Sequence, residues 1–116
     1  MAGNDYNKAG MAYVMSKNFV VWYAQKRAYE YAKKGIRVVS VSPGLIETDM
    51  GTREVEQSDF ARQMIEQTCA GRMGTPQELG FAIATIADER NGYLCGIDVL
   101  IDGGASTSKK FKDLKK

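Results

Sequence analysis

Ile36-Arg37-Val38-Val39-Ser40-Val41-Ser42 is a short stretch, rich in β-branched residues, with apolar side chains on both of its alternating faces. A strand of this kind is typical of a parallel sheet that helices cover on both sides. Gly35 separates it from a long helical pattern, and Pro43-Gly44 ends it. Helix, glycine turn and parallel-type strand make up half of a βαβ unit. The stretch therefore predicts an α/β fold.

The helical pattern before this strand runs from Ala9 to about Lys34. Between Met11 and Ala24 it is apolar nearly all round, which predicts a helix buried on more than one side. Lys33 and Lys34 suit the negative end of the helix dipole, and Gly35 suits a left-handed C-cap. The polar residues ahead of the pattern include three possible helix caps: Asn4, Asp5 and Asn7.

Short helices are predicted after the strand. Thr48 or Asp49 can cap a short turn, and Ser58 can cap a helix that runs to Thr68. The apolar residues of that helix suit either a lid over a substrate or the packed face of a plain surface helix, and periodicity does not separate the two readings. These residues are Phe60, Met64 and Ile65.

A further helix opens at Thr75-Pro76, where Thr75 and Glu78 have the spacing of a capping box and proline takes the first helical position. Cys95–Ile101 then reads as a second apolar strand that ends at Asp102-Gly103-Gly104. The connection between the two strands is long and helical, which predicts that they are parallel. Ligands of open α/β sheets bind beyond the carboxyl ends of the strands, so Pro43–Thr48 is placed where a ligand would bind.

Composition indicates one small globular domain: 116 residues, 44% hydrophobic and 26% charged. No apolar run is long enough to span a bilayer, and the first residues lack the pattern of a secretory signal, which together predict a cytoplasmic protein without membrane attachment. There is no His, and Cys69 and Cys95 do not have the spacing of metal ligands. Two buried, reduced thiols and no metal site are expected.

The net charge of +2 comes from the carboxyl-terminal end. Lys109–Lys116 holds five Lys and one Asp, and the rest of the chain has 11 basic and 13 acidic residues. Residues 106–116 are therefore expected to be a solvated, partly disordered Lys-rich tail. The body has no basic stripe, so no nucleic-acid site is predicted.

Tyr13 and Lys17 are four residues apart in the long helical pattern, which places them one turn from each other on one helix face. A cation near a phenol lowers the phenol's pKa, and such a phenol can exchange a proton with a carbonyl or alcohol oxygen. Tyr and Lys are both common, so the spacing alone favours an ordinary solvated face.

Four motifs that follow one another along the chain favour a functional interpretation of Tyr13 and Lys17. Tyr13-Val14-Met15-Ser16-Lys17 has the form Tyr-x-x-x-Lys, and Pro43-Gly44-Leu45-Ile46-Glu47-Thr48 follows the Val-rich strand. Gly71–Glu78 precedes a helix, and Gly96 leads through the last strand to Asp102-Gly103-Gly104. In these motifs the chain resembles the carboxyl-terminal half of a short-chain dehydrogenase/reductase, over residues 9–105. The resemblance implies the carboxyl-terminal part of a Rossmann-like, doubly wound parallel sheet.

The resemblance also implies roles for individual residues. Tyr13 would be the general acid/base, and Lys17 would lower its pKa and hydrogen-bond the nicotinamide ribose of NAD or NADP. Pro43 and Gly44 would shape the floor under the nicotinamide, and the backbone of Ile46 and the hydroxyl of Thr48 would contact the cofactor. Residues 47–68 would form a mobile substrate loop, with the substrate-facing residues Met50, Phe60 and Met64. An alcohol or ketone is the implied substrate, and the helix containing Trp22 is the implied homo-oligomer contact.

The sequence departs from the family in its nucleotide-binding half. Its 12 Gly include no two separated by a single residue, so a Gly-x-Gly-x-x-Gly turn is excluded. The family's Asn-Ala-Gly element and catalytic Ser have no counterpart either. Residues 1–105 are therefore expected to be a partial domain without its amino-terminal nucleotide-binding half. Two functions remain open: the catalytic portion of an alcohol/ketone oxidoreductase, and a truncated, non-catalytic oligomerisation or interaction module.

Overall fold

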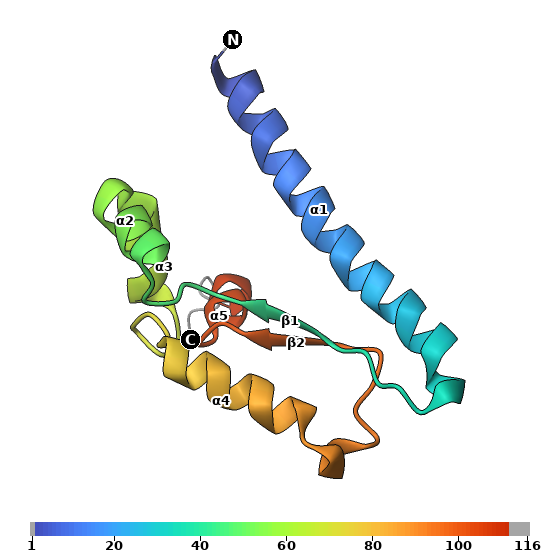
Figure 1. Cartoon of the computed structure of the whole chain (residues 1–116). Coiled ribbons are helices and arrows are strands. Elements are labelled where there is room, and N and C mark those ends of the chain that lie inside the picture. The colour runs from blue at the N-terminus through green and yellow to red at the C-terminus, as the bar shows by residue number, and fades with distance from the viewer. Residues whose placement is uncertain (1, 112–116) are drawn as a thin grey trace. The chain divides into compact units, whose positions relative to one another are not determined.

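The computed structural model describes residues 2–111, and it describes the side chains of residues 11–111 except Tyr13, Met50 and Glu54. Most of this part of the chain is helical, and several helices separate strand β1 from strand β2 along the chain (Figure 1). In order the elements are α1 (Ala2–Tyr31), η1 (Ala32–Lys34), β1 (Ser40–Pro43), α2 (Asp49–Gln57), α3 (Asp59–Gln67), α4 (Pro76–Ala87), η2 (Glu89–Asn91), β2 (Asp98–Ile101) and α5 (Ala105–Phe111).

The two strands form one parallel pair, as predicted. The N–H of Ser40 donates to the carbonyl of Ile97 at 3.1 Å, and the N–H of Gly44 donates to the carbonyl of Ile101 at 2.9 Å. Both partners advance by four residues, which is the register of parallel strands. The regular strand is shorter than the predicted Ile36–Ser42, since the residues before Ser40 pair only through single contacts such as Gly96 N–H to Val38 O at 2.9 Å.

Helix α1 begins earlier than the sequence pattern indicates. It starts at Ala2, so Asn4, Asp5 and Asn7 lie inside the helix and the prediction that they cap it is wrong. The carboxyl end is as predicted: η1 tightens the last turn, and Gly35 closes it at φ 76° with its N–H on the carbonyl of Ala32 at 3.0 Å. A left-handed glycine commonly ends a helix in this way.

The predicted burial of α1 on more than one side is wrong for the described residues. Of its described side chains only Ala28, 3% exposed, is buried, where it lies against Gly96. Phe19 and Trp22 are 57% and 53% exposed, and their rings lie 5.8 Å apart. The apolar residues of α1 are thus present as predicted, but no described residue covers most of them.

The starts of the next three helices were predicted from their caps. The Thr48 hydroxyl accepts the N–H of Gly51 at 3.1 Å and caps α2, which is longer than the predicted short turn. The Ser58 hydroxyl accepts the N–H of Ala61 at 3.2 Å and caps α3. At α4 the predicted capping box is complete, with Thr75 and Glu78 each accepting the backbone N–H of the other, at 3.1 and 3.0 Å. Side-chain caps of this kind satisfy the free N–H groups of a helix's first turn.

The carboxyl-terminal end differs from the prediction of an irregular tail. Residues Ala105–Phe111 form helix α5, while residues 112–116 of the predicted tail lie outside the described part of the chain. The Asp102 carboxylate accepts the N–H groups of Gly104 at 3.0 Å and Ser106 at 2.9 Å, which satisfies donors at the start of α5. Burial raises the pKa of this carboxyl, but the hydrogen bonds from Ser106 and the adjacent backbone N–H groups leave it below its ordinary value.

The two cysteines are free thiols, but they are not buried as predicted. Cys95 is partly exposed, and Cys69 is exposed in the turn after α3, where its Sγ lies 3.2 Å from the Ser108 hydroxyl oxygen. Within the described part of the chain, no helix has the length and apolar composition needed to cross a membrane.

Candidate active site

The predicted site residues fall in two compact units of the chain. The first unit contains the chain up to Ser40 together with Gly92–Val99, and the second contains Val41–Asn91 together with the chain from Leu100. Tyr13 and Lys17 belong to the first unit. Pro43, the remaining cofactor residues and the substrate-loop residues belong to the second.

In the first unit, α1 supplies the Tyr-x-x-x-Lys motif. The helix is uninterrupted from Ala2 to Tyr31, so Tyr13 and Lys17 stand one turn apart on the same face. The side chain of Lys17 is exposed, and that of Tyr13 lies outside the described side chains. The backbone therefore holds the two residues in the relation that a phenol and its neighbouring ammonium group require.

In the second unit, Pro43 ends β1 and Gly44 begins the loop that follows it. The N–H of Gly44 still pairs with Ile101, which brings its backbone against the residue after β2. A Cβ on Gly44 would lie 2.8 Å from both the Cα and the Cβ of Asp102. Only glycine fits this close approach of two backbones, so the position of the loop at the carboxyl end of the strand depends on the absence of a side chain.

Ile46 lies next to Gly74 in an isolated parallel bridge. The hydrogen bonds of the bridge are made by the neighbours of Ile46: Gly74 N–H donates to Leu45 O at 2.9 Å, and Glu47 N–H donates to Gly74 O at 2.8 Å. In this register the N–H of Ile46 points away from Gly74. The carbonyl of Ile46 accepts the N–H of Thr48 at 2.8 Å.

Thr48 has a structural role at this loop, since its hydroxyl caps α2. The buried Gly51 fits beneath it, because a Cβ there would lie 2.2 Å from the carbonyl oxygen of Ile46. Pro43 at the end of β1 is therefore followed by Gly44, Ile46 and Thr48 in one short loop. The tight packing of Gly51 fixes the direction in which that loop enters α2.

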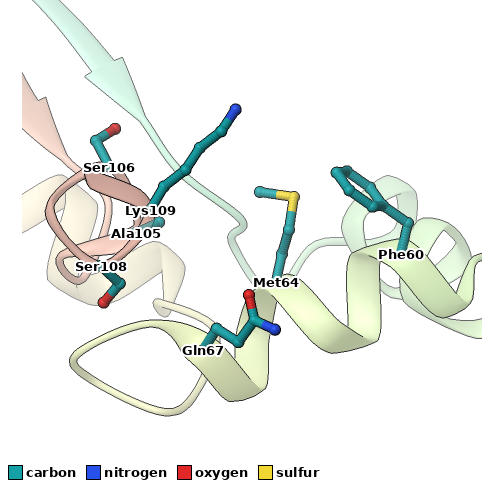
Figure 2. A pocket seen from close by; sticks show the side chains of 7 residues that line it. All are labelled: Phe60, Met64, Gln67, Ala105, Ser106, Ser108 and Lys109. Carbon is teal, nitrogen blue, oxygen red and sulfur yellow. The ribbon is translucent and has the colours of Figure 1, made fainter. Parts of the chain in front are cut away.

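The residues predicted to form a substrate loop lie on α2 and α3. Met50 is in α2, and its side chain lies outside the described ones. Phe60 and Met64, 70% and 38% exposed, are one turn apart on α3. They line a pocket of about 250 Å³ whose other wall is α5 (Figure 2). The residues from α5 are Ala105, Ser106, Ser108 and Lys109, and Gln67 of α3 completes the lining.

Sequence reasoning missed the part that α5 plays in this pocket, because a run of Lys at the end of a chain ordinarily marks a solvated tail. A signal was present in Asp102, an acceptor placed before a short polar segment that ends in Lys109 and Lys110. Such a pattern matches a capped helix with cations at its negative end.

An ion pair stabilises the segment that carries Gly74. The guanidinium of Arg72 donates to both carboxylate oxygens of Glu78, at 2.8 and 2.9 Å. This pairing, together with the N–H and hydroxyl of Thr75, lowers the pKa of the Glu78 carboxyl to about 2. The same carboxylate thus joins the turn at Arg72 to the start of α4. Among the described residues there is no cluster of three or more His, Cys, Asp or Glu side chains able to hold a metal ion.

The chain is similar to known proteins over most of its length. A family model described as Enoyl-(Acyl carrier protein) reductase matches residues 1–106. The chain is 33% identical over 108 residues to 3beta-hydroxysteroid dehydrogenase 2 of Eggerthella lenta, covering 91% of this chain and 42% of the relative. It is 37% identical over 97 residues to the 3-oxoacyl-[acyl-carrier-protein] reductase FabG of Salmonella typhimurium, covering 83% of this chain and 39% of the relative.

Solved structures agree with the sequence relatives. The solved structure of 4-hydroxyisoleucine dehydrogenase complexed with NADH matches with a TM-score of 0.74 at 31% identity. The match covers 84% of this chain and 40% of that one. The chain therefore spans about two fifths of the length of the relatives it matches.

Proposed function

Since the chain belongs to the short-chain dehydrogenase/reductase family, we propose that it is the carboxyl-terminal catalytic portion of an NAD(P)-dependent oxidoreductase that interconverts an alcohol and a ketone or aldehyde. The observation that supports this most is the Tyr-x-x-x-Lys motif on the uninterrupted helix α1. Among the matched proteins, a hydroxysteroid dehydrogenase and an oxoacyl reductase bear names that describe chemistry at an alcohol or ketone carbon.

In this proposal Tyr13 is the general acid/base. Its phenol donates a proton to the substrate oxygen when a ketone is reduced and accepts one when an alcohol is oxidised. Lys17, one turn along α1, would favour the phenolate and so bring the pKa of Tyr13 closer to neutral pH. Its ammonium group would also hydrogen-bond the ribose of the cofactor.

The loop after β1 fits a nicotinamide cofactor. The N–H of Ile46 points away from the bridge to Gly74, and the carbonyl of Ile46 is already occupied by Thr48. An amide oxygen of the cofactor would thus meet a free donor there. Pro43 and Gly44 lie at the carboxyl end of β1, where ligands of α/β sheets bind. When bound, the nicotinamide supplies or accepts the hydride.

The proposal is tested in a protein that joins these 116 residues to an amino-terminal nucleotide-binding half of the family. Tyr13→Phe removes the proton that is exchanged but keeps the ring. It is expected to lower kcat by about 10²–10⁴-fold and to leave the Kd for NADH within about twofold. Lys17→Met should reduce both kcat and cofactor affinity, because Lys17 has two roles.

Tyr29→Phe is the matched control. Tyr29 is on the same helix and is 82% exposed, so removal of its hydroxyl should leave kcat unchanged. If Tyr13→Phe retained more than a tenth of the wild-type kcat in assays of ketone reduction, Tyr13 would not be the general acid/base and the proposal would be wrong.

The exposed apolar surface of α1 favours a second role, association with another copy of the protein. Phe19 and Trp22 lie on this surface, with Lys26 5.5 Å from the centre of the Trp22 ring. Large contiguous apolar patches are rare on monomeric proteins and commonly mark interfaces. This role is compatible with catalysis, and it is the part of the interaction-module alternative that the described side chains support.

A further inference from the structure

The pocket between α3 and α5 joins two kinds of surface. Phe60 and Met64 give it an apolar wall, and Lys109 contributes an ammonium group at its edge. Figure 2 shows Met64 and Lys109 extending in the same direction from facing helices, with Phe60 further along α3. A volume of about 250 Å³ is close to the lower end of ligand sites, which range over roughly 300–1,000 Å³.

The apolar wall is open to solvent. Phe60 is 70% exposed and Met64 38% exposed, although residues of these types are usually found inside proteins. They occupy the α3 face that also carries Gln67, while Ala61, on another face of the helix, is buried at 6% exposure. An alkyl chain placed on Phe60 and Met64 would gain the free energy of covering this surface.

The charge at the pocket has one sign. Among the described residues that line the pocket, Lys109 is the one charged residue and none is a carboxylate. The hydroxyls nearby are engaged: Ser108 lies 3.2 Å from the Cys69 sulfur, and Ser106 hydrogen-bonds the Asp102 carboxylate. The adjacent Lys110 is directed elsewhere, with its ammonium 5.2 Å from the centre of the Phe111 ring. Lys109 is therefore the group that would select a ligand by charge.

We propose that this pocket binds an apolar ligand that carries a single anionic group, such as the carboxylate of a fatty acid, with the chain on Phe60 and Met64 and the anion at Lys109. Because Phe60 and Met64 belong to the proposed substrate loop, this inference rests on the proposed oxidoreductase function and assigns its substrate class.

The test compares octanoate with 1-octanol, which has the same chain but no charge. Isothermal titration calorimetry is carried out on the purified 116-residue chain at low ionic strength. Octanoate should bind more tightly than 1-octanol, and only octanoate should lose affinity between 0.05 and 0.5 M NaCl, since salt screens an exposed ion pair.

Two matched variants locate the anion. Lys109→Met removes the charge and keeps most of the side-chain volume, and it should raise the Kd of octanoate about fivefold, the upper end for an exposed ion pair. Its effect on 1-octanol should be less than twofold. Lys110→Met makes the same change at the next residue of α5, outside the pocket, and should leave both affinities unchanged. Circular dichroism confirms that each variant retains its helix content.

Met64→Ala tests the apolar wall, and it should weaken both ligands about threefold or more. Equal affinity for octanoate and 1-octanol in the wild-type chain, or equal effects of Lys109→Met and Lys110→Met, would overturn the inference. Octanoate binding does not involve Tyr13, so Tyr13→Phe should leave it intact. Failure of the octanoate test therefore differs from failure of the proposed catalysis, which shows as retained activity in Tyr13→Phe.

Discussion

At the scale of single residues, Gly44 has no room for a side chain. A Cβ there would lie 2.8 Å from the Cα of Asp102, and backbone atoms cannot rotate away as the end of a side chain can. Gly44→Ala should lower the free energy of unfolding by about 1–3 kcal/mol, the usual cost of overpacking. Urea denaturation followed by circular dichroism measures the change.

Gly80→Ala is the control for this prediction. Gly80 lies inside α4, and a Cβ there would meet nothing within 4 Å. Alanine has the higher helix propensity, so this variant should be more stable by about 0.5–1 kcal/mol. Two glycine-to-alanine changes in one chain are thus expected to have opposite signs. Equal effects would mean that Gly44 does not lie against Asp102.

The placement of Tyr13 and Lys17 could be predicted from the sequence, but the requirement for glycine at position 44 could not. The spacing of Tyr13 and Lys17 is a local property of a helix, so the sequence alone placed them on one face. The requirement for glycine at position 44 comes from Asp102, which is distant in the sequence and reaches Gly44 through the pairing of β1 with β2. A contact of that kind is not encoded in the neighbouring residues.

At the scale of elements, the start of α4 depends on an ionised carboxylate. The pKa of Glu78 is lowered from 4.5 to about 2, chiefly by the guanidinium of Arg72. A carboxyl whose pKa is lowered on folding stabilises the folded state above its ordinary pKa. That contribution is lost as the pH falls from about 4.5, where the unfolded chain protonates Glu78, to about 2, where the folded chain does so as well.

Glu78→Gln should therefore be less stable than the wild type at pH 7, and the difference should shrink as the pH falls through this window. Urea midpoints measured from pH 7 to pH 2 give the result. Glu66→Gln, at an exposed carboxylate of α3, is the control and should show a smaller difference at pH 7. A difference between the wild type and Glu78→Gln that did not change with pH would contradict the role of the charge.

The starts of α2, α3 and α4 were predicted better than the start of α1 or the length of β1. The caps at Thr48, Ser58 and Thr75 act on N–H groups within three residues, so their effect can be read from adjacent sequence. Strand β1 was predicted too long, because regular pairing needs partners on other segments. Helix α5 was missed because its capping group, Asp102, lies beyond two glycines and its cations resembled a tail.

At the scale of the whole chain, exposed apolar side chains on α1 predict self-association. They include Met11, Val14, Met15, Phe19, Val20 and Trp22, each more than half exposed. Sedimentation velocity of the 116-residue chain should show species larger than a monomer. Trp22→Glu should shift the distribution towards monomer, because a charge would be buried at the contact without a partner.

Tyr93→Glu provides the comparison for Trp22→Glu. Tyr93 is fully exposed but is not part of α1, so a charge at this position should leave the sedimentation profile unchanged. A sharp monomer boundary for the wild-type chain at tens of micromolar would show that the surface of α1 does not self-associate.

The scarcity of buried side chains has a thermal consequence. Ala28 and Ala61 are the buried apolar residues of the described chain, and exposure of apolar surface is what raises the heat capacity on unfolding. A compact domain gains about 12–15 cal/mol/K per residue. A chain that buries so little apolar surface has a much smaller increase in heat capacity on unfolding. Its free energy of unfolding therefore changes only gradually with temperature. Its unfolding on heating is accordingly broad rather than abrupt, and cooling does little to weaken it.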